Sequence, residues 1–296
     1  MLAYLEETLP RRKSQVPAIY HARRLTNYFS GRNMSEIRAR EIRAYITARQ
    51  NDGVKAGTIN RELGLFQAAI NHAIKEWEWR LDNPVRGRFL KEPEGRLRWL
   101  SSEEIEALLQ QAKEVPHLNA FVLLALNTGC RSGELLGLEW SRVDWSRREI
   151  RLDAEHTKTG KGRIIPTNDA AHEALLDRAR FRATHCPASP WVFAHEDGER
   201  IKSIRRSFKT ACRNARIEDA TPHTLRHTCA SHLVSSGVPI YEVQQLLGHS
   251  SHEMTQRYAH LAPDRVKRAV SALEIMSTKS THPGTNEKAA KVLMTP

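Results

Sequence analysis

Apolar residues in the first third of the chain recur at intervals of three and four positions. This spacing, typical of helices with one apolar face, holds in three segments: residues 17–29, 35–50 and 58–77. In the last segment Ile59, Leu63, Phe66, Ile70 and Ile74 share one face. The pattern predicts an all-α N-terminal domain over residues 1–93.

The end of this domain is marked by a change in composition. Asn83-Pro84 stops the helical pattern, and residues 87–95 are polar, as expected of a linker. Ser101 and Glu104 then form a Ser-x-x-Glu capping box, which opens a helix whose Ile105, Leu108 and Leu109 face inward. A second domain over residues 94–276 is predicted.

Most of the second domain is predicted to be helical. Residues 121–126 are apolar all round, typical of a central buried helix that ends at Thr128-Gly129. Either Thr128 or Ser132 is expected to cap the next helix, with Arg131 beside its start. Further helices are predicted at 169–182, 203–215, 222–236, 239–247, 251–258 and 263–275. The polar tail 277–296 is expected to be mobile or to dock on a partner.

One stretch alternates with a period of two instead. Ile150 and Leu152 alternate with polar residues, residues 159–162 supply turn chemistry, and Ile164-Ile165 resume the apolar run. This is a predicted β-hairpin that carries Lys158. The fold class is therefore mainly α with a small β-sheet, an α+β domain following an all-α one.

Composition narrows the possible partners. Lys and Arg number 46 against 34 Asp and Glu, for a formal charge of +12 spread along the chain. Such a surface attracts polyanions, although a solvated cationic surface would have the same composition. The four cysteines form no CxxC pair, which argues against a disulfide framework or zinc ribbon and fits a reducing cytosol. No apolar run approaches about 18 residues, so no membrane partner is expected.

The segment 221–226 could bind a phosphate. Thr221 precedes Pro222 as an expected N-cap, so His223 and Arg226 project from one face near a helix start, where anions are attracted. The same residues would also fit an ordinary amphipathic helix with a basic face.

Two further residues could complete a reactive site. Gly248 is expected to end a helix and to leave His249 in a turn before a helix capped by Ser250 or Ser251. Tyr258 offers a hydroxyl, and a phenol with a reference pKa of about 10 needs cations or a base to react. A half-buried aromatic is the alternative for Tyr258, and a solvated turn is the alternative for Lys158.

Metal and nucleotide sites are not indicated. His223 and His227 have zinc-helix spacing without the carboxylate, and His252-Glu253 is followed by Gln256 where HExxH needs histidine. No P-loop is present, so no cofactor is expected. The histidines outside the proposed set are expected to be structural or to face solvent: His227, His232, His252 and His260.

Taken together, five motifs in register resemble the tyrosine recombinase family, in its phage integrase branch. They are Thr-Gly-Cys-Arg-Ser-Gly-Glu-Leu-Leu-Gly-Leu at 128–138, Thr-Lys-Thr-Gly at 157–160, His-Thr-Leu-Arg-His-Thr at 223–228, Leu-Leu-Gly-His-Ser at 246–250 and Thr-Gln-Arg-Tyr-Ala-His at 255–260. Residues 56–63 and 71–73 resemble the family's helical core-binding domain. On the third predicted helix, Thr58, Asn60 and Arg61 are candidate groove contacts, with ordinary surface residues as the equal alternative.

The resemblance implies a catalytic role for six residues: Arg131, Lys158, His223, Arg226, His249 and Tyr258. Arg131 and Arg226 would clamp the scissile phosphate, and Tyr258 would attack it to give a 3′-phosphotyrosyl DNA without ATP. Lys158 would protonate the leaving oxygen. His223 would hold the phosphate and assist proton removal from the phenol, His249 would donate a hydrogen bond, and Glu134 would orient Arg131.

The resemblance also implies a setting. Duplex DNA would be clasped between the two domains, and a homotetramer would form on DNA, with 263–275 or the tail docking on a neighbouring protomer. The resemblance is compatible with accessory factors that bend DNA or set the direction of the reaction. It also implies a cytoplasmic, nucleoid-associated protein encoded by a bacterium or a phage. Many phage integrases carry a separate arm-binding domain before the core-binding domain, and none is expected within these residues, as in a simpler recombinase or in a fragment of a longer integrase. The alternatives are relaxation of type IB topoisomerase kind, a non-catalytic DNA-binding regulator, or a metal-dependent nuclease.

Overall fold

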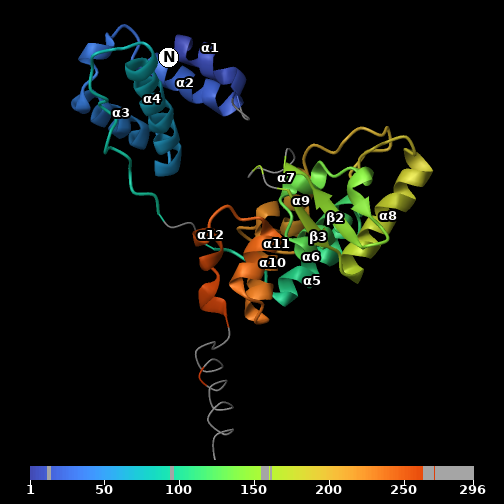
Figure 1. Cartoon of the computed structure of the whole chain (residues 1–296). Helices are drawn as coiled ribbons and strands as arrows, with labels where there is room; N and C mark the ends of the chain where they lie inside the picture. The colour runs from blue at the N-terminus through green and yellow to red at the C-terminus, as the bar shows by residue number, and fades with distance from the viewer. Residues whose placement is uncertain (12–14, 94–96, 155–159, 161, 263–269, 271–296) are drawn as a thin grey trace, which may run out of the picture. The chain divides into compact units, whose positions relative to one another are not determined.

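The computed structural model describes residues 1–11, 15–93, 97–154, 160, 162–262 and 270 (Figure 1). The chain divides into two compact units, Met1–Gly95 and Arg96–Pro296. Lys158, most of the predicted helix at 263–275 and the tail 277–296 lie outside the described residues.

Helices are the regular elements among the described residues of the first unit. Its elements are α1 (Leu2–Thr8), η1 (Leu9–Arg11), α2 (Val16–Tyr28), η2 (Met34–Glu36), α3 (Ala39–Asn51) and α4 (Ala56–Glu76). The predicted face of α4 is confirmed, because Ile59, Leu63, Phe66 and Ile70 are buried. The single helix predicted at 35–50 is wrong at its start, where η2 precedes α3. Helix α1 has no counterpart among the predicted elements.

The segment after α4 is attached to the first unit rather than being a free linker. The side-chain amide of Asn60 donates to the carbonyl of Leu90 and to Glu92, both at 2.8 Å, and its oxygen accepts from the Leu90 N–H at 2.8 Å. Leu90 also packs against the core of this unit. Asn60, expected as a groove contact, uses its amide for these internal bonds.

The second unit is mainly helical with a small sheet. Its helices are α5 (Ser102–Ala112), α6 (Pro116–Thr128), α7 (Ser132–Leu136), η3 (Trp140–Arg142), α8 (Asp169–His185), α9 (Arg205–Asn214), α10 (Pro222–Ser235), α11 (Ile240–Leu247), α12 (Glu253–Gln256) and η5 (Ala259–Leu261). Helix α6 lies in the core against α8 and α10. The predicted α+β class is confirmed.

Local sequence signals fix several helix ends. Ser101 Oγ accepts from the Glu104 N–H at 3.2 Å, while Glu104 accepts from the Ser101 N–H at 2.9 Å, so the predicted capping box is confirmed. Gly129 and Gly248 end α6 and α11 with φ of +61° and +64°, in the left-handed region that favours glycine.

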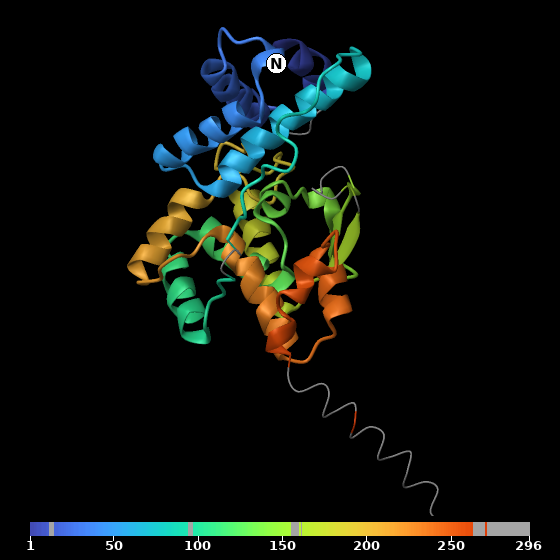
Figure 2. The same ribbon diagram turned by 90° about the vertical axis from the view of Figure 1, so that its left-hand side faces the viewer.

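The sheet has three antiparallel strands in the order β1 (Val143–Asp144), β2 (Glu149–Leu152) and β3 (Arg163–Pro166). The predicted hairpin is therefore confirmed and gains one short strand. Ile150 pairs with Ile165, and both are buried against the helices. Strand β3 lies beside α11, seen where the green strands meet the orange helix in Figure 2.

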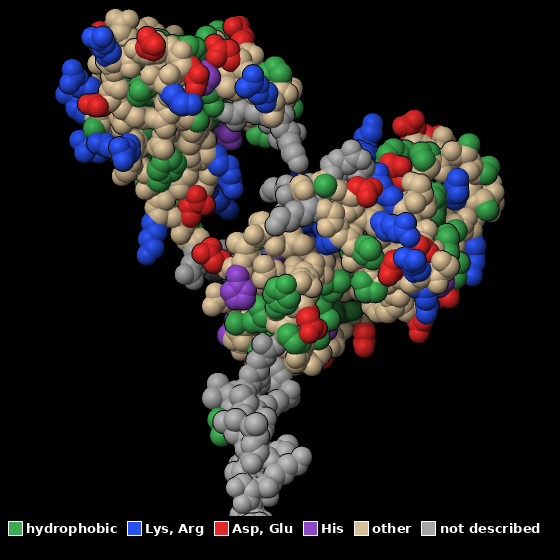
Figure 3. All heavy atoms as spheres, viewed as in Figure 1, with side chains coloured by type: hydrophobic (Ala, Val, Ile, Leu, Met, Phe, Trp, Pro, Cys, Tyr) green, Lys and Arg blue, Asp and Glu red, His purple; other side chains and the backbone are tan. Residues whose placement is uncertain are grey.

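The basic residues are spread over the surface, as expected from their distribution along the chain. Lys and Arg side chains are scattered over the visible faces of both units instead of forming one cluster (Figure 3). Among the described residues, no helix is long and apolar enough to cross a membrane.

Candidate active site

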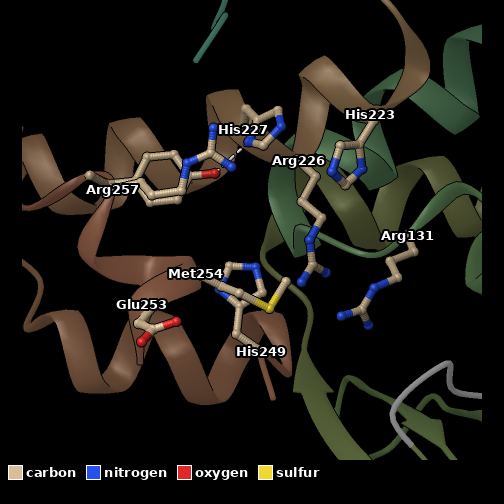
Figure 4. Close-up of a pocket in the computed structure, with 9 residues that line it drawn as sticks. Arg131, His223, Arg226, His227, His249, Glu253, Met254 and Arg257 are labelled. Atoms are coloured by element: carbon tan, nitrogen blue, oxygen red, sulfur yellow. Dashed lines mark hydrogen bonds between the residues drawn. The ribbon is translucent and has the colours of Figure 1, made fainter. Parts of the chain in front are cut away.

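A cavity of about 250 Å³ in the second unit gathers most of the predicted site (Figure 4). Its lining residues are Arg131, His223, Arg226, His227, His249, Glu253, Met254, Arg257 and Tyr258. Five of the six predicted catalytic residues are among them, contributed by α10 and by the segments around α7 and α12. The sixth, Lys158, lies outside the described residues.

Arg226 on α10 is a buried cation, with 2% of its surface exposed. Its guanidinium donates to the carbonyls of Gly129 at 2.7 Å and Leu247 at 2.6 Å. Burial, followed by repulsion from Arg131, lowers the pKa of Arg226 to about 10. A Cβ at position 129 would clash with Leu247 Cδ2, so glycine allows this close approach.

Arg131 is aimed by a carboxylate and a carbonyl. It donates from Nη1 to Glu134 Oε1 at 2.8 Å and from Nη2 to the Gly248 carbonyl at 3.1 Å. Its own N–H donates to Glu134 Oε2 at 2.8 Å. Arg131 itself occupies the N-cap position of α7, so the expectation that Thr128 or Ser132 caps this helix is wrong.

Arg163 on β3 was missed by the sequence reasoning. It donates to both oxygens of Glu134, at 3.2 and 2.7 Å, and from Nε to the Leu246 carbonyl at 3.1 Å. The carbonyls of Leu246, Leu247 and Gly248 therefore each accept from a different arginine. These groups lack helical partners at a helix end, where cations are also favoured.

His249 follows the C-terminal end of α11 and faces Arg131 and Arg226. Its Nδ1 lies 2.7 Å from the buried Thr255 hydroxyl. Burial, followed by the charges of Arg226 and Arg131, lowers the pKa of His249 to about 3. The ring is therefore neutral near pH 7. The expected Ser250 or Ser251 cap is wrong, because α12 begins at Glu253 with His252 in the N-cap position.

Tyr258 is buried, with 2% of its surface exposed, so the half-buried alternative is wrong. It lies between α12 and η5 rather than within a helix. Burial raises the pKa of Tyr258 to about 12, an effect that Arg226 and Arg257 partly offset. The phenol is therefore protonated at neutral pH.

His227 was expected to be structural or to face solvent, and it lies half-buried beside Tyr258. Its ring lines the cavity, and its Nδ1 shares a hydrogen bond with the Tyr258 hydroxyl, drawn as the dashed line in Figure 4. His223, one turn earlier, is exposed, with its ring centroid 4.6 Å from that of His227. His232, His252 and His260 are exposed as expected.

The arrangement suits an anion that receives a nucleophile. Two guanidiniums and a neutral imidazole can donate hydrogen bonds to phosphate oxygens, and a phenol lies in the same cavity. Within the described part of the chain, no group of His, Cys, Asp and Glu side chains is placed to hold a metal ion. This combination has the groups that phosphoryl transfer to a tyrosine requires.

Comparison with known proteins agrees with this class. A family model, the phage integrase family, matches residues 98–265, so the chain belongs to the phage integrase family of tyrosine recombinases. The chain is 32% identical to the integrase of Salmonella phage P22 over 69% of its length and 54% of that protein. It is 30% identical to the integrase of Haemophilus phage HP1 over 82% of its length and 68% of that protein.

Solved structures share the fold. An integrase of transposon Tn1549, in complex with circular intermediate DNA, superposes with a TM-score of 0.71 at 19% identity, covering 90% of this chain and 97% of that one. A lambda integrase dimer bound to a COC′ core site gives a TM-score of 0.72 at 22% identity, covering 88% of this chain and 95% of that one.

Proposed function

We propose that the chain is a site-specific DNA recombinase that cleaves and rejoins DNA through Tyr258. The observation that carries this proposal is the single cavity in which a phenol, two buried or half-buried arginines and His249 meet. Relatives named as integrases and as tyrosine recombinases support recombination over relaxation or simple DNA binding.

In the proposed reaction Arg131 and Arg226 hold the scissile phosphate while its non-bridging oxygens gain charge. His223 and His249 add hydrogen bonds. Tyr258 attacks phosphorus to form a 3′-phosphotyrosyl DNA, and Lys158 protonates the departing 5′ oxygen. One phosphoester replaces another of similar energy, so the break reseals without ATP.

Both units are proposed to contact duplex DNA, residues 1–93 as a core-binding domain and residues 94–276 as the catalytic domain. The related DNA-bound Tn1549 and lambda integrases support a DNA partner, and a lambda integrase tetramer bound to a Holliday junction supports a homotetramer. Docking of the tail 277–296 on a neighbouring protomer belongs to the same proposal. So do accessory DNA-bending or directionality factors and residence at a bacterial nucleoid.

The test is a nicked suicide duplex that carries the repeats flanking the gene, incubated with the protein in EDTA. Wild type is expected to form a covalent adduct, because nucleophilic attack needs no metal ion here, and Tyr258→Phe is expected to form none. Binding without any Tyr258-dependent adduct would overturn the proposal. Recombination between two such sites would separate strand exchange from relaxation.

A further inference from the structure

The hydroxyl of Tyr258 has a defined partner within the protein. His227 reaches it from α10, 31 positions earlier in the chain, and the two ring centroids lie 6.0 Å apart. The hydrogen bond joins the phenol oxygen to Nδ1 of the imidazole. The nucleophile is therefore already paired with a group that can accept a proton.

The protonation state of His227 fits an acceptor. Burial, followed by the charges of His223, Arg257 and Arg226, lowers the pKa of His227 to about 4. The ring is neutral at physiological pH, so one of its nitrogens carries a lone pair. Because the phenol of Tyr258 is protonated under the same conditions, it donates and Nδ1 accepts.

Two other histidines line the cavity, and they are placed differently. Nδ1 of His249 is engaged with the Thr255 hydroxyl, and the ring faces the Arg131 and Arg226 charges that bind the phosphate. His223 is exposed and meets the edge of the His227 ring. The contact geometry thus divides the roles, with His249 on the phosphate side and His227 on the phenol.

We propose that His227 is the general base that removes the proton from Tyr258 during DNA cleavage, an inference that rests on the function proposed above. The Tyr258 O–H bond breaks and its proton moves to Nδ1 of His227, while the phenol oxygen forms a bond to phosphorus. The bond from phosphorus to the 5′ oxygen breaks, and that oxygen takes its proton from Lys158. On rejoining, protonated His227 returns the proton to the phenol.

Substrate binding makes this transfer easier. The charged groups that face His227 are His223 and Arg226 on its own helix, His249 beyond α11, and Arg257 next to Tyr258. A bound phosphate neutralises part of the arginine charge that opposes protonation of the imidazole. The base is therefore weakest in the free protein and strengthens once DNA occupies the cavity.

The experiment compares His227→Ala and His227→Asn with wild type and with His232→Ala, an exposed histidine on the same helix. Both His227 variants are expected to form the suicide-substrate adduct about 10² to 10⁴ times more slowly, because general-base assistance is lost. His227→Asn keeps a polar atom near Nδ1 but accepts no proton. DNA affinity and melting temperature, measured in parallel, are expected to match those of His232→Ala.

The pH profile separates a base from a structural contact. Between pH 6 and 9 the protonation state of His227 is expected to change the wild-type cleavage rate little, because His227 is neutral throughout. The His227→Ala rate is expected to rise about tenfold per pH unit, since it depends on the small phenolate fraction. Added imidazole is expected to restore part of the lost rate to the alanine variant.

A substrate with sulfur in place of the bridging 5′ oxygen provides the last discrimination. The thiolate of this substrate leaves without protonation by an acid, so the substrate compensates for loss of the acid and not for loss of the base. It is therefore expected not to restore the cleavage rate of His227→Ala. Rescue by this substrate, or a His227 variant as fast as wild type or faster, would overturn the inference. If wild type itself formed no Tyr258-dependent adduct, the proposed function would fail instead. Should the alanine variant not fold, the asparagine variant decides the question.

Discussion

Each unit of the molecule holds a buried glutamate against arginine, with opposite consequences. Glu62 in the first unit is fully buried and accepts from the Tyr45 hydroxyl at 2.7 Å and from Arg49 at 3.1 and 2.9 Å. Glu134 in the second unit is 5% exposed and accepts from Arg131 and Arg163. In each case burial acts to raise the pKa of the carboxyl, but the hydrogen bonds and positive charges around it together hold that pKa below its usual value, so both glutamates are ionised.

The difference lies in how the charges balance. Arg49 is shared by two acids, since it also donates to Asp52 at 2.9 Å, so this network has no unmatched cation. Around Glu134 two arginines share one carboxylate, and Arg226 beside them is held only by carbonyls. The excess positive charge faces the cavity. The same pairing therefore builds a structural brace in one unit and an anion site in the other.

The strongest way to break this comparison is Glu62→Ala. Removing the carboxylate leaves the Arg49 guanidinium and the Tyr45 hydroxyl without their buried hydrogen-bond acceptor. Such a loss typically lowers the free energy of unfolding by about 3 to 5 kcal/mol. Urea unfolding of the full chain is expected to show this loss in the transition of the first unit. Adduct formation by protein that remains folded is expected to be unchanged per bound complex. A stability change below about 1 kcal/mol would contradict the bracing role.

A smaller effect is expected from Arg163→Ala, which sharpens the comparison from the other side. The substitution removes two hydrogen bonds to Glu134 and one to the Leu246 carbonyl, so Glu134 aims Arg131 less firmly. Hydrogen bonds to charged groups contribute about 1.5 to 3 kcal/mol, which corresponds to roughly 10- to 100-fold slower cleavage.

The matched control for Arg163 is Arg151→Ala on the neighbouring strand β2, an exposed arginine paired with Asp144. Single-turnover cleavage and DNA affinity are measured for both variants. Arg163→Ala is expected to slow cleavage with near-normal affinity, whereas Arg151→Ala leaves the cleavage rate unchanged. Equal cleavage rates in the two variants would remove Arg163 from the positioning network.

The smallest expected effect is a difference in acid sensitivity. Burial lowers the pKa of His227 to about 4 and of His249 to about 3, against about 6.5 in an unfolded chain. Between pH 6.5 and these lowered pKa values, the unfolded state binds more protons than the folded state. The contribution of these histidines to the free energy of unfolding is therefore fully present above pH 6.5 and falls as the pH drops towards 4. His117 in the second unit and His21 in the first also have lowered pKa values.

Among the described histidines, three of the four with lowered pKa values therefore belong to the second unit. Calorimetry is expected to show that a drop from pH 7 to pH 4.5 lowers the melting temperature of the second unit more than that of the first. His249→Asn is expected to reduce this slope, with His232→Asn as the control. A first unit that melts earlier in acid would show that the site histidines do not govern this response.

Features set by neighbouring residues were predictable from the sequence. The Ser101 cap, the glycine ends at Gly129 and Gly248 and the Pro222 start each depend on residues within one helical turn. The cluster of Arg131, His223, Arg226, His249 and Tyr258 was predicted by motif resemblance rather than by any local rule, and their catalytic roles remain proposals.

Contacts between distant residues were not predictable in this way. Arg163 and Leu246 are 83 positions apart, and His227 and Tyr258 are 31 apart. In sequence, Arg163 is one basic residue of a hairpin and His227 one histidine among many. Only folding decides which of these meets a partner, and burial beside other cationic groups lowers the pKa of His227.

The final turn of α11 connects otherwise separate parts of the active site. Because the carbonyls of Leu246, Leu247 and Gly248 each anchor a different guanidinium, fraying of this one turn would remove one hydrogen bond from each of the three arginines at once. The order of a few peptide units therefore bears on the placement of all three guanidiniums together.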